Sequence, residues 1–205
     1  MNINNKEAIS ILQQDPNLKE IIMHIDLPPI PSTHDVFNDL VSCIVEQQIH
    51  YRSTKQLFAR MLRQAGLEYV SLENFHEFEA HGLPAAKLSA SKYETLLRVI
   101  EHWQLHEINW QEQSDETVYK ILGSIKGVGK WSADMILMYT LRRPNIFPED
   151  DYHLQQIMTR LYGLDHKSKL KQKMKAVADN WGEHKSLAVL YLLAWKQQAK
   201  VKASV

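Results

Sequence analysis

The sequence predicts an all-α protein. Three observations support this fold class: apolar residues recur at helical spacing, strand signals are scarce, and the 205 residues include only seven glycines. The helical spacing is clear at Val36, Leu40, Cys43 and Ile44, which would share one face of a helix. No apolar–polar alternation bounded by turn residues stands out, as a half-buried strand would require.

The predicted helices follow one another along most of the chain. Ser32 or Thr33 can cap a helix that starts at 36, and Ser114 opens another with acids in its first turn. Pro144 and Gly163 are typical helix ends. The expected helices are about 5–14, from 36 to a polar break at 46–48, 52–65, 114–122, 130–143, 166–180 and 184–200. Two more are expected within longer segments: one in 82–103 after a glycine stop, and one in 147–163 after a loop.

The chain length suits one large domain or two small ones. Because no repeat, low-complexity segment or flexible linker is found, we expect a single unit over 1–205, built from two interleaved helical lobes. One lobe would take about 30–115, and the other about 1–29 together with 116–205.

Composition excludes several classes of protein. The single cysteine, Cys43, excludes an internal disulfide framework and a four-cysteine iron–sulfur or zinc site, and is typical of a small buried residue. The N-terminus lacks the basic and apolar segments of a signal peptide. The longest apolar run, 187–195, is far shorter than the ~20 residues that span a bilayer. We expect no membrane association and a reducing compartment.

Charge is unevenly distributed along the chain. The net charge is zero, but residues 116–205 carry 15 lysines and arginines against 8 acids, and residues 1–115 carry 9 against 16. This polarity can direct one face towards a polyanion. The alternative is that the basic segment 166–175 is only a solvated helix face.

The segment "IKGVGKWSADM" predicts a tight turn followed by a helix. Gly127 and Gly129 let the backbone approach a partner closely. The first N–H groups of the following helix have no internal acceptors and suit a phosphate, to which Ser132 could add a hydroxyl. The alternative is a plain packing joint between two helices.

The segment "FPEDDYHL" places three acids in a row, Glu149 to Asp151. Such a run is most often an N-terminal helix cap. It also supplies carboxylates for chemistry.

Together, "LGSIKGVGKWSADMIL" and "FPEDDYHL" resemble the helix–hairpin–helix DNA glycosylase superfamily. "LVSCIVEQQIHYRSTKQL" and "HGLPAAKLSASKYETL" extend the resemblance, so that it covers about 36–200. The alkylation-repair branch, 3-methyladenine DNA glycosylase II, is the most similar, in a compact all-helical form. The resemblance implies two helical lobes with a helix–hairpin–helix motif and an active-site cleft between them.

The resemblance also implies an activity. It is hydrolysis of the N-glycosidic bond of alkylated purines, such as 3-methyladenine and 7-methylguanine, in duplex DNA, during base-excision repair. The family's catalytic aspartate falls on Asp151, which leaves Asp150 as a helix cap or supporting group and Glu149 exposed. In the bifunctional branch a lysine two residues after the hairpin forms a Schiff base. Trp131 occupies that place here, which implies no lyase activity.

Further roles follow only from the resemblance. Gln48, with Ile49 beside it, would fill the gap left by an everted base. A mainly aromatic pocket would hold that base, formed by Trp131, Tyr152, Met135, Tyr191 and Trp195. Tyr191 and Trp195 lie one turn apart on a helix, and at that spacing the alternative is that they are core residues. The hairpin would bind DNA phosphate through Gly127, Gly129, Lys130 and Ser132. Its main-chain carbonyls at Gly123, Ile125 and Val128 would bind Na⁺ or K⁺.

The implied partner is double-stranded DNA with a damaged base, and the family forms its site without a partner chain, so we expect a monomer. Catalysis would need no cofactor, and no iron–sulfur cluster is expected. The location would be a bacterial cytoplasm, at the nucleoid, or a nucleus, and the protein would not be secreted. Alternatives are a glycosylase for uracil, hypoxanthine, ethenoadenine or an oxidised purine, a non-catalytic DNA-binding module, and a helical scaffold.

Overall fold

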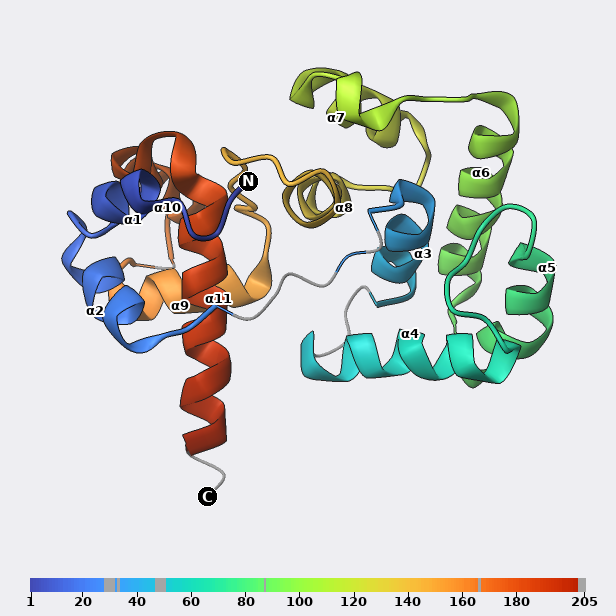
Figure 1. The fold of residues 1–205 in the computed structure, drawn as a ribbon, viewed down its shortest axis with the longest axis horizontal. Helices are drawn as coiled ribbons and strands as arrows, with labels where there is room; N and C mark the ends of the chain where they lie inside the picture. Colours follow the sequence, from blue (N-terminus) through green and yellow to red (C-terminus); the bar gives the residue numbers. More distant parts are fainter. Residues whose placement is uncertain (28–31, 33, 47–50, 87, 166, 203–205) are drawn as a thin grey trace. The chain divides into compact units, whose positions relative to one another are not determined.

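The computed structural model describes residues 1–27, 32, 34–46, 51–86, 88–165 and 167–202, apart from the side chains of 51–56 and 199–202. These residues form helices and no strands, which confirms the predicted fold class (Figure 1). The chain folds into two compact units, one over Met1–Ile30 with Arg142–Val205 and the other over Pro31–Leu141. In the described part of the chain, no helix is both long and apolar enough to cross a membrane.

The unit over 31–141 begins with α3 and ends with the π-helical turn η4. Its elements are α3 (Val36–Glu46), α4 (Tyr51–Ala65), α5 (Phe75–Glu77), η1 (Phe78–Gly82), η2 (Leu83–Ala85), α6 (Ala90–Leu105), η3 (Trp110–Glu112), α7 (Asp115–Ser124), α8 (Lys130–Met135) and η4 (Ile136–Thr140). Residues 116–141 therefore belong with 31–115, and not with the termini as the predicted division had them. Their helix α8 packs on α3 and α7, both of which lie in this unit.

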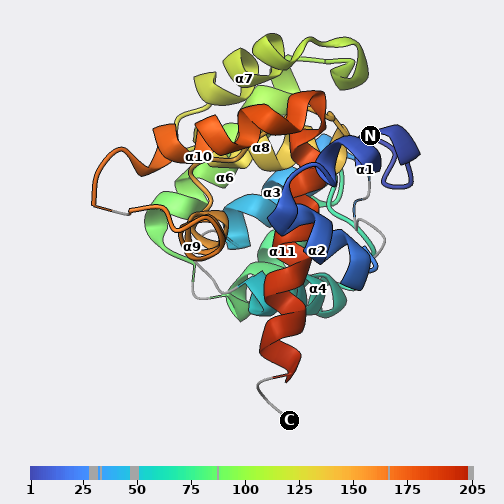
Figure 2. The same cartoon turned by 90° about the vertical axis from the view of Figure 1, so that its left-hand side faces the viewer.

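The other unit joins the two ends of the chain. Its elements are α1 (Lys6–Leu12), α2 (Pro16–His24), α9 (Tyr152–Leu161), α10 (Leu170–Ala178), η5 (Asp179–His184) and α11 (Lys185–Lys202). The long helix α11 packs against α2 and α9, as Figures 1 and 2 show.

Several predicted helices differ from the structure at their ends, among them the one expected over 166–180, which is α10 and begins at Leu170. The first, about 5–14, is replaced by α1 and α2, because Asp15 caps a new helix with Pro16 at its first position. The helix expected after the glycine stop in 82–103 is α6, which begins at Ala90, where Ser89 accepts a hydrogen bond from Lys92 N. The helix expected over 130–143 remains α-helical only to Met135 and continues as η4.

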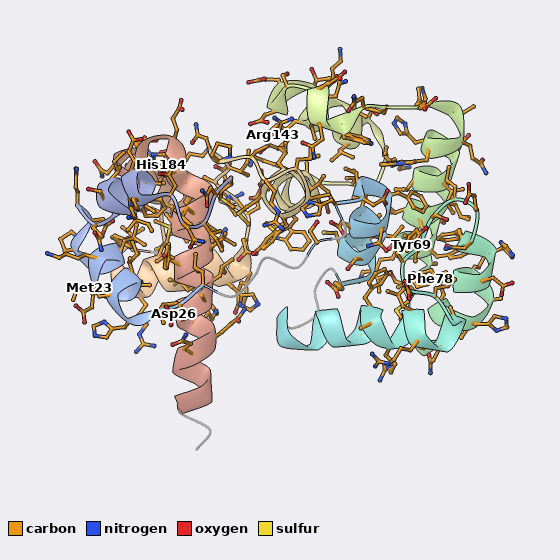
Figure 3. The ribbon with its side chains drawn as sticks, viewed as in Figure 1. Met23, Asp26, Tyr69, Phe78, Arg143 and His184 are labelled. Carbon is orange, nitrogen blue, oxygen red and sulfur yellow. The ribbon has the colours of Figure 1, made fainter. Side chains whose placement is uncertain are left out.

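Aromatic packing forms the core of the unit over 31–141. Phe78 is fully buried, and its ring lies 5.6 Å from that of Phe58 and 6.0 Å from that of Phe75. Figure 3 labels Phe78 beside α4. Phe37 of α3 extends this cluster to Trp103 of α6, with ring centroids 5.6 Å apart. Burying such rings removes 150–250 Å² each from water, so this cluster fixes α3 against α6. The helix α8, which follows the glycine turn, packs on α3.

Asp15 is the polar centre of the terminal unit. Its Oδ1 accepts hydrogen bonds from the backbone N–H groups of Asn17 and Leu18, at 2.9 and 3.2 Å. Its Oδ2 accepts from the Tyr162 hydroxyl at 2.9 Å and from the fully buried Trp181 Nε1 at 3.0 Å. Burial, followed by the Asp15 charge, raises the pKa of Tyr162, so its hydroxyl keeps its proton and donates at neutral pH. One carboxylate thus joins α2 to α9 and η5.

Asp15→Ala should destabilise the protein by about 2–4 kcal/mol. The change removes a helix cap and leaves the buried Trp181 N–H and the Tyr162 hydroxyl without their acceptor. Denaturant unfolding followed by tryptophan fluorescence measures the loss. Asp35→Ala is the matched control, since Asp35 also accepts a backbone N–H, from Asn38, near a helix start. If both variants lose only about 1 kcal/mol, Asp15 is an ordinary cap.

Candidate active site

The glycine turn between α7 and α8 lies against α6. Gly127 has φ +104°, a conformation that side chains rarely adopt, and a Cβ added there would lie 2.1 Å from Thr95 Oγ1. Thr95 is itself fixed, because its hydroxyl donates to the Ser91 carbonyl at 2.9 Å. Gly129, by contrast, has φ −95° and open space where a Cβ would stand. Glycine is therefore required at 127 by sterics, whereas at 129 it leaves the backbone uncovered.

A buried carboxylate ties the start of α8 to α7. Asp134 is fully buried, and Lys130 Nζ lies 3.0 and 2.8 Å from its two oxygens. The Tyr119 hydroxyl of α7 donates to the same carboxylate. Lys130 remains partly exposed, but its ammonium group forms an ion pair with the buried Asp134 carboxylate. Ser132 is 1% exposed, so burial withdraws its hydroxyl from the surface, and we correct its predicted role as a phosphate donor.

The predicted ligands of the monovalent cation, the main-chain carbonyls of Gly123, Ile125 and Val128, are oxygen donors of the kind that such a cation accepts. Gly123 lies in the last turn of α7, where carbonyls have no intrahelical donor. The Ile125 carbonyl accepts from Val128 N at 2.9 Å and keeps a second lone pair. No group of three or more histidine, cysteine, aspartate or glutamate side chains able to hold a metal is found among the described residues.

Asp151 is the N-cap of α9. Its Oδ1 accepts a hydrogen bond from Leu154 N at 2.8 Å, its N–H donates to the Pro148 carbonyl at 2.9 Å, and it is 9% exposed. The prediction that Asp150 is the cap is therefore wrong. The extended backbone of Asp151, at φ −70° and ψ 117°, is what allows its side chain to reach back over the first turn.

The two acids before Asp151 pair with lysines of α10. Lys175 Nζ lies 2.6 Å from Glu149 Oε2, and Lys171 bonds Asp150. The Glu149 side chain is 13% exposed, so the prediction that it is exposed is wrong: its ion pair and the neighbouring chain cover it. Part of the basic segment 166–175 therefore forms ion pairs with the acidic loop, and is not simply a solvated helix face.

A polar chain that sequence reasoning missed follows Asp151 along α9. Lys196 of α11 lies 2.9 Å from His153 Nδ1 and donates to Gln156 Oε1 at 2.6 Å. Gln156 Nε2 in turn donates to the Tyr152 hydroxyl at 2.6 Å, which orients a ring that is 65% exposed. His153 had a signal, since it stands two residues after the acid. Lys196 had none, because 43 residues separate it from His153.

The predicted pocket residues differ in exposure and belong to different units. In the unit over 31–141, Trp131 is half-buried and Met135 is buried. In the terminal unit, Tyr191 is a core residue whose pKa is raised by burial and by Asp26, which Figure 3 labels. Trp195 is half-buried, with the Arg160 guanidinium 5.9 Å from its ring centre.

Two predicted site residues, Gln48 and Ile49, lie outside the described residues. The helix that leads to them, α3, is held at its end by Lys92, whose ammonium donates to the Val45 carbonyl at 3.0 Å. Burial lowers the pKa of Lys92.

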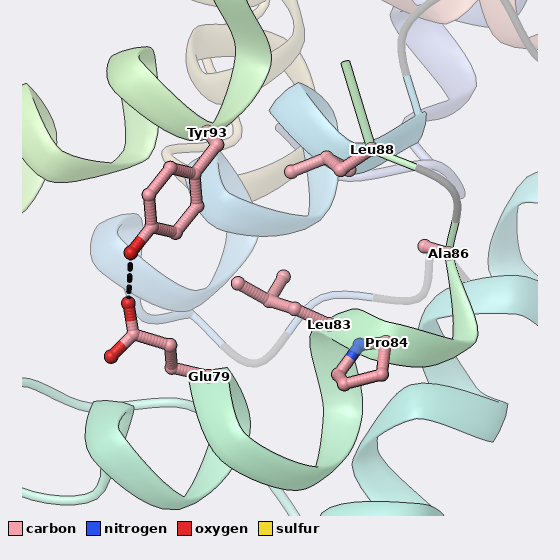
Figure 4. Close-up of a pocket in the computed structure, with 6 residues that line it drawn as sticks. All are labelled: Glu79, Leu83, Pro84, Ala86, Leu88 and Tyr93. Atoms are coloured by element: carbon pink, nitrogen blue, oxygen red, sulfur yellow. Dashed lines mark hydrogen bonds between the residues drawn. The ribbon is translucent and has the colours of Figure 1, made fainter. Parts of the chain in front are cut away.

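A pocket of about 300 Å³ in the unit over 31–141 contains none of the predicted site residues. It is lined by Glu79, Leu83, Pro84, Ala86, Leu88 and Tyr93 (Figure 4). The Tyr93 hydroxyl donates to Glu79 across it. The pocket is mostly apolar, and its one carboxylate, Glu79, accepts the hydrogen bond from Tyr93.

Gly127→Ala should destabilise the protein by about 2–3 kcal/mol, because the new methyl group meets Thr95 and the backbone is left-handed. Gly129→Ala, the matched control two residues away, should cost about 1 kcal/mol or less. Denaturant unfolding compares the two. Equal losses at both positions would show that the turn can move away from α6.

Comparison with known proteins shows which family shares these motifs. Residues 41–183 match the model of the "HhH-GPD superfamily base excision DNA repair protein" family. A Bacillus subtilis protein, YfjP, whose name gives it provisionally as a DNA-3-methyladenine glycosylase, is 28% identical over 91% of this chain and 72% of its own. The Schizosaccharomyces pombe DNA-3-methyladenine glycosylase 1 is 25% identical over 63% of this chain and 64% of its own. The chain thus spans just under two thirds of that second relative.

Among solved structures, a DNA-3-methyladenine glycosidase from Bacillus halodurans has a TM-score of 0.70 at 27% identity, covering 94% of this chain and 89% of its own. The Schizosaccharomyces pombe 3-methyladenine DNA glycosylase Mag1, solved in complex with abasic DNA, has a TM-score of 0.73 at 21% identity, covering 91% and 95%. The latter likeness shows the fold alone. Because the family model matches more than half of the sequence, this chain belongs to the HhH-GPD superfamily of base-excision DNA repair proteins.

Proposed function

We propose that this protein is a monofunctional DNA glycosylase that hydrolyses the N-glycosidic bond of alkylated purines in duplex DNA. One observation carries the proposal: the acid at the family's catalytic place, Asp151, caps α9 and is held there by Leu154 N. The helix terminus gives the carboxylate a defined position, which electrostatic catalysis requires. Relatives named for 3-methyladenine support the substrate class.

The chemistry needs one carboxylate and one water molecule. As the bond between C1′ and the base nitrogen breaks, positive charge develops on the sugar, and the Asp151 carboxylate stabilises it. The same carboxylate can orient or deprotonate the attacking water. An alkylated purine already carries positive charge, so it leaves without an acid to protonate it. Hydrolysis therefore needs no cofactor.

Trp131 supports hydrolysis without strand cleavage. Elimination through a Schiff base requires an amine at the reacting centre, and an indole has none. The neighbouring Lys130 cannot easily substitute, because its ammonium contacts both oxygens of the buried Asp134. We therefore propose that the product is an intact strand with an abasic site.

Aromatic side chains are the proposed contacts for the damaged base. Trp131 and Tyr152 are the candidates with accessible rings, at intermediate and 65% exposure, and an electron-rich face attracts a cationic base. Met135 and Tyr191 are buried and serve first as core residues, and the half-buried Trp195 ring already has Arg160 over it. Gln48 and Ile49 are retained as the proposed wedge on the resemblance alone.

The proposed partner is double-stranded DNA containing the damaged base, bound by a monomer. The exposed backbone around Gly127 and Gly129 would meet a phosphate, with a monovalent cation on the turn's carbonyls supplying further positive charge. Lys126 lies in the turn itself and is exposed, whereas Lys130 is engaged by Asp134. The side-chain contact to phosphate thus falls to Lys126 more than to Lys130.

Asp151→Asn should abolish base release from methylated duplex DNA and leave DNA binding intact. Asparagine also caps helices, so the fold is kept while the negative charge is lost. Mass spectrometry of released bases and a gel-shift titration measure the two properties. Asp150→Asn is the matched control and should retain most of the activity. Full base release by Asp151→Asn would refute the assignment, and none by the wild-type protein, with binding intact, would indicate a non-catalytic module.

Lys126→Met should weaken binding to undamaged duplex and reduce the slope of log K against log salt by about 0.9, the value for one phosphate contact. Lys130→Met should change that slope little and instead cost about 1–3 kcal/mol of stability, since it leaves Asp134 buried without its cation. Salt titrations by fluorescence anisotropy and denaturant unfolding distinguish the two lysines. A full slope change at Lys130 alone would reverse the assignment.

A further inference from the structure

The basic helix α10 packs on α9 and faces the loop that carries Asp151. Lys175 pairs with Glu149 at 2.6 Å, and Lys171 bonds Asp150, so each acid that precedes Asp151 has its own cation. The hydrogen bond to Asp150 raises the pKa of Lys171, which keeps that ammonium charged. These pairs join residues 21 and 26 positions apart, so local sequence does not account for them.

We propose that Lys171 and Lys175 are positioning residues for Asp151. They neutralise the other two carboxylates of the loop 149–151, so that Asp151 acts without two further negative charges beside it. The inference rests on the proposed function of Asp151.

The loop is anchored on one side by its backbone and on the other by these lysines. Glu149 N donates to the Phe147 carbonyl at 2.9 Å, and Gln155 Nε2 of α9 donates to the Glu149 carbonyl at 2.8 Å. Among the described residues, Glu149 and Asp150 form ion pairs with Lys175 and Lys171 respectively, and the charge of Glu149 also acts on Lys171. Without those cations, three consecutive carboxylates would repel one another, and the loop would shift. Displacements of about 1 Å at a reacting group can cost up to ~100-fold in rate.

The basic segment offers a matched control. Lys167 and Lys169 are exposed and form no ion pair among the described residues, so their removal takes away the same charge without releasing an acid. If the segment's role were to bind DNA phosphate, both pairs of lysines would contribute similarly. If Lys171 and Lys175 position the loop, only their removal affects catalysis.

The test compares K171M/K175M with K167M/K169M in single-turnover base release from methylated duplex at saturating enzyme, where binding no longer limits the rate. We expect K171M/K175M to slow release about tenfold, with little change in thermal unfolding, because partly exposed ion pairs contribute little stability. K167M/K169M should release bases at the wild-type rate. An unchanged rate in K171M/K175M, or an equal loss in the control, overturns the proposal.

Charge rescue separates positioning from general damage. Adding E149Q and D150N to K171M/K175M removes both the cations and the acids, so it should restore most of the rate, and K171R/K175R should keep it. A quadruple variant that stays as slow as K171M/K175M overturns the proposal. Because Asp151→Asn tests the proposed function separately, an inactive Asp151→Asn with a fully active K171M/K175M rejects only this inference.

Discussion

The hydrogen bond from Leu154 N to Asp151 is the interaction on which the site depends. A free aspartate side chain samples several rotamers, and stabilising a developing charge requires one of them to be held in advance. Here the N-terminus of α9 supplies that restraint, because its first N–H groups need an acceptor that the helix cannot provide. On the proposed function, the carboxylate that caps the helix is also the one that the reaction requires.

Carboxylates also organise the interiors of the two units, Asp15 in the terminal unit and Asp134 and Asp39 in the unit over 31–141. Asp15 gathers backbone, phenol and indole donors and joins both ends of the chain. Asp134 gathers Lys130 and Tyr119 and fixes the start of α8. Asp39 accepts from the Thr140 hydroxyl at 2.7 Å and so joins α3 to η4. Partly or fully buried acids of this kind must be satisfied locally, which gives an all-helical fold without strand ladders its long-range polar restraints.

Sequence alone predicted the elements whose signals are local. The helix cap at Ser114, the turn at Gly127 and the acid run at 149–151 are all short patterns with a direct physical cause. The choice of Asp151 over Asp150 as cap depends on backbone angles that no local pattern shows. Lys130 and Asp134 stand four apart, a spacing that permits their pair, but burial of the acid decides that the pair forms.

The charge distribution illustrates this limit most clearly. The excess of basic residues in 116–205 suggests a surface for a polyanion, yet three lysines of 166–175 pair with acids from the same region of the chain. What remains for a phosphate at the turn is mainly backbone N–H groups, whose contribution no residue count records. Two of the five lysines in this segment balance the acids that precede Asp151. On the proposed function, recognition of a phosphate would therefore depend more on the turn conformation that Gly127 permits.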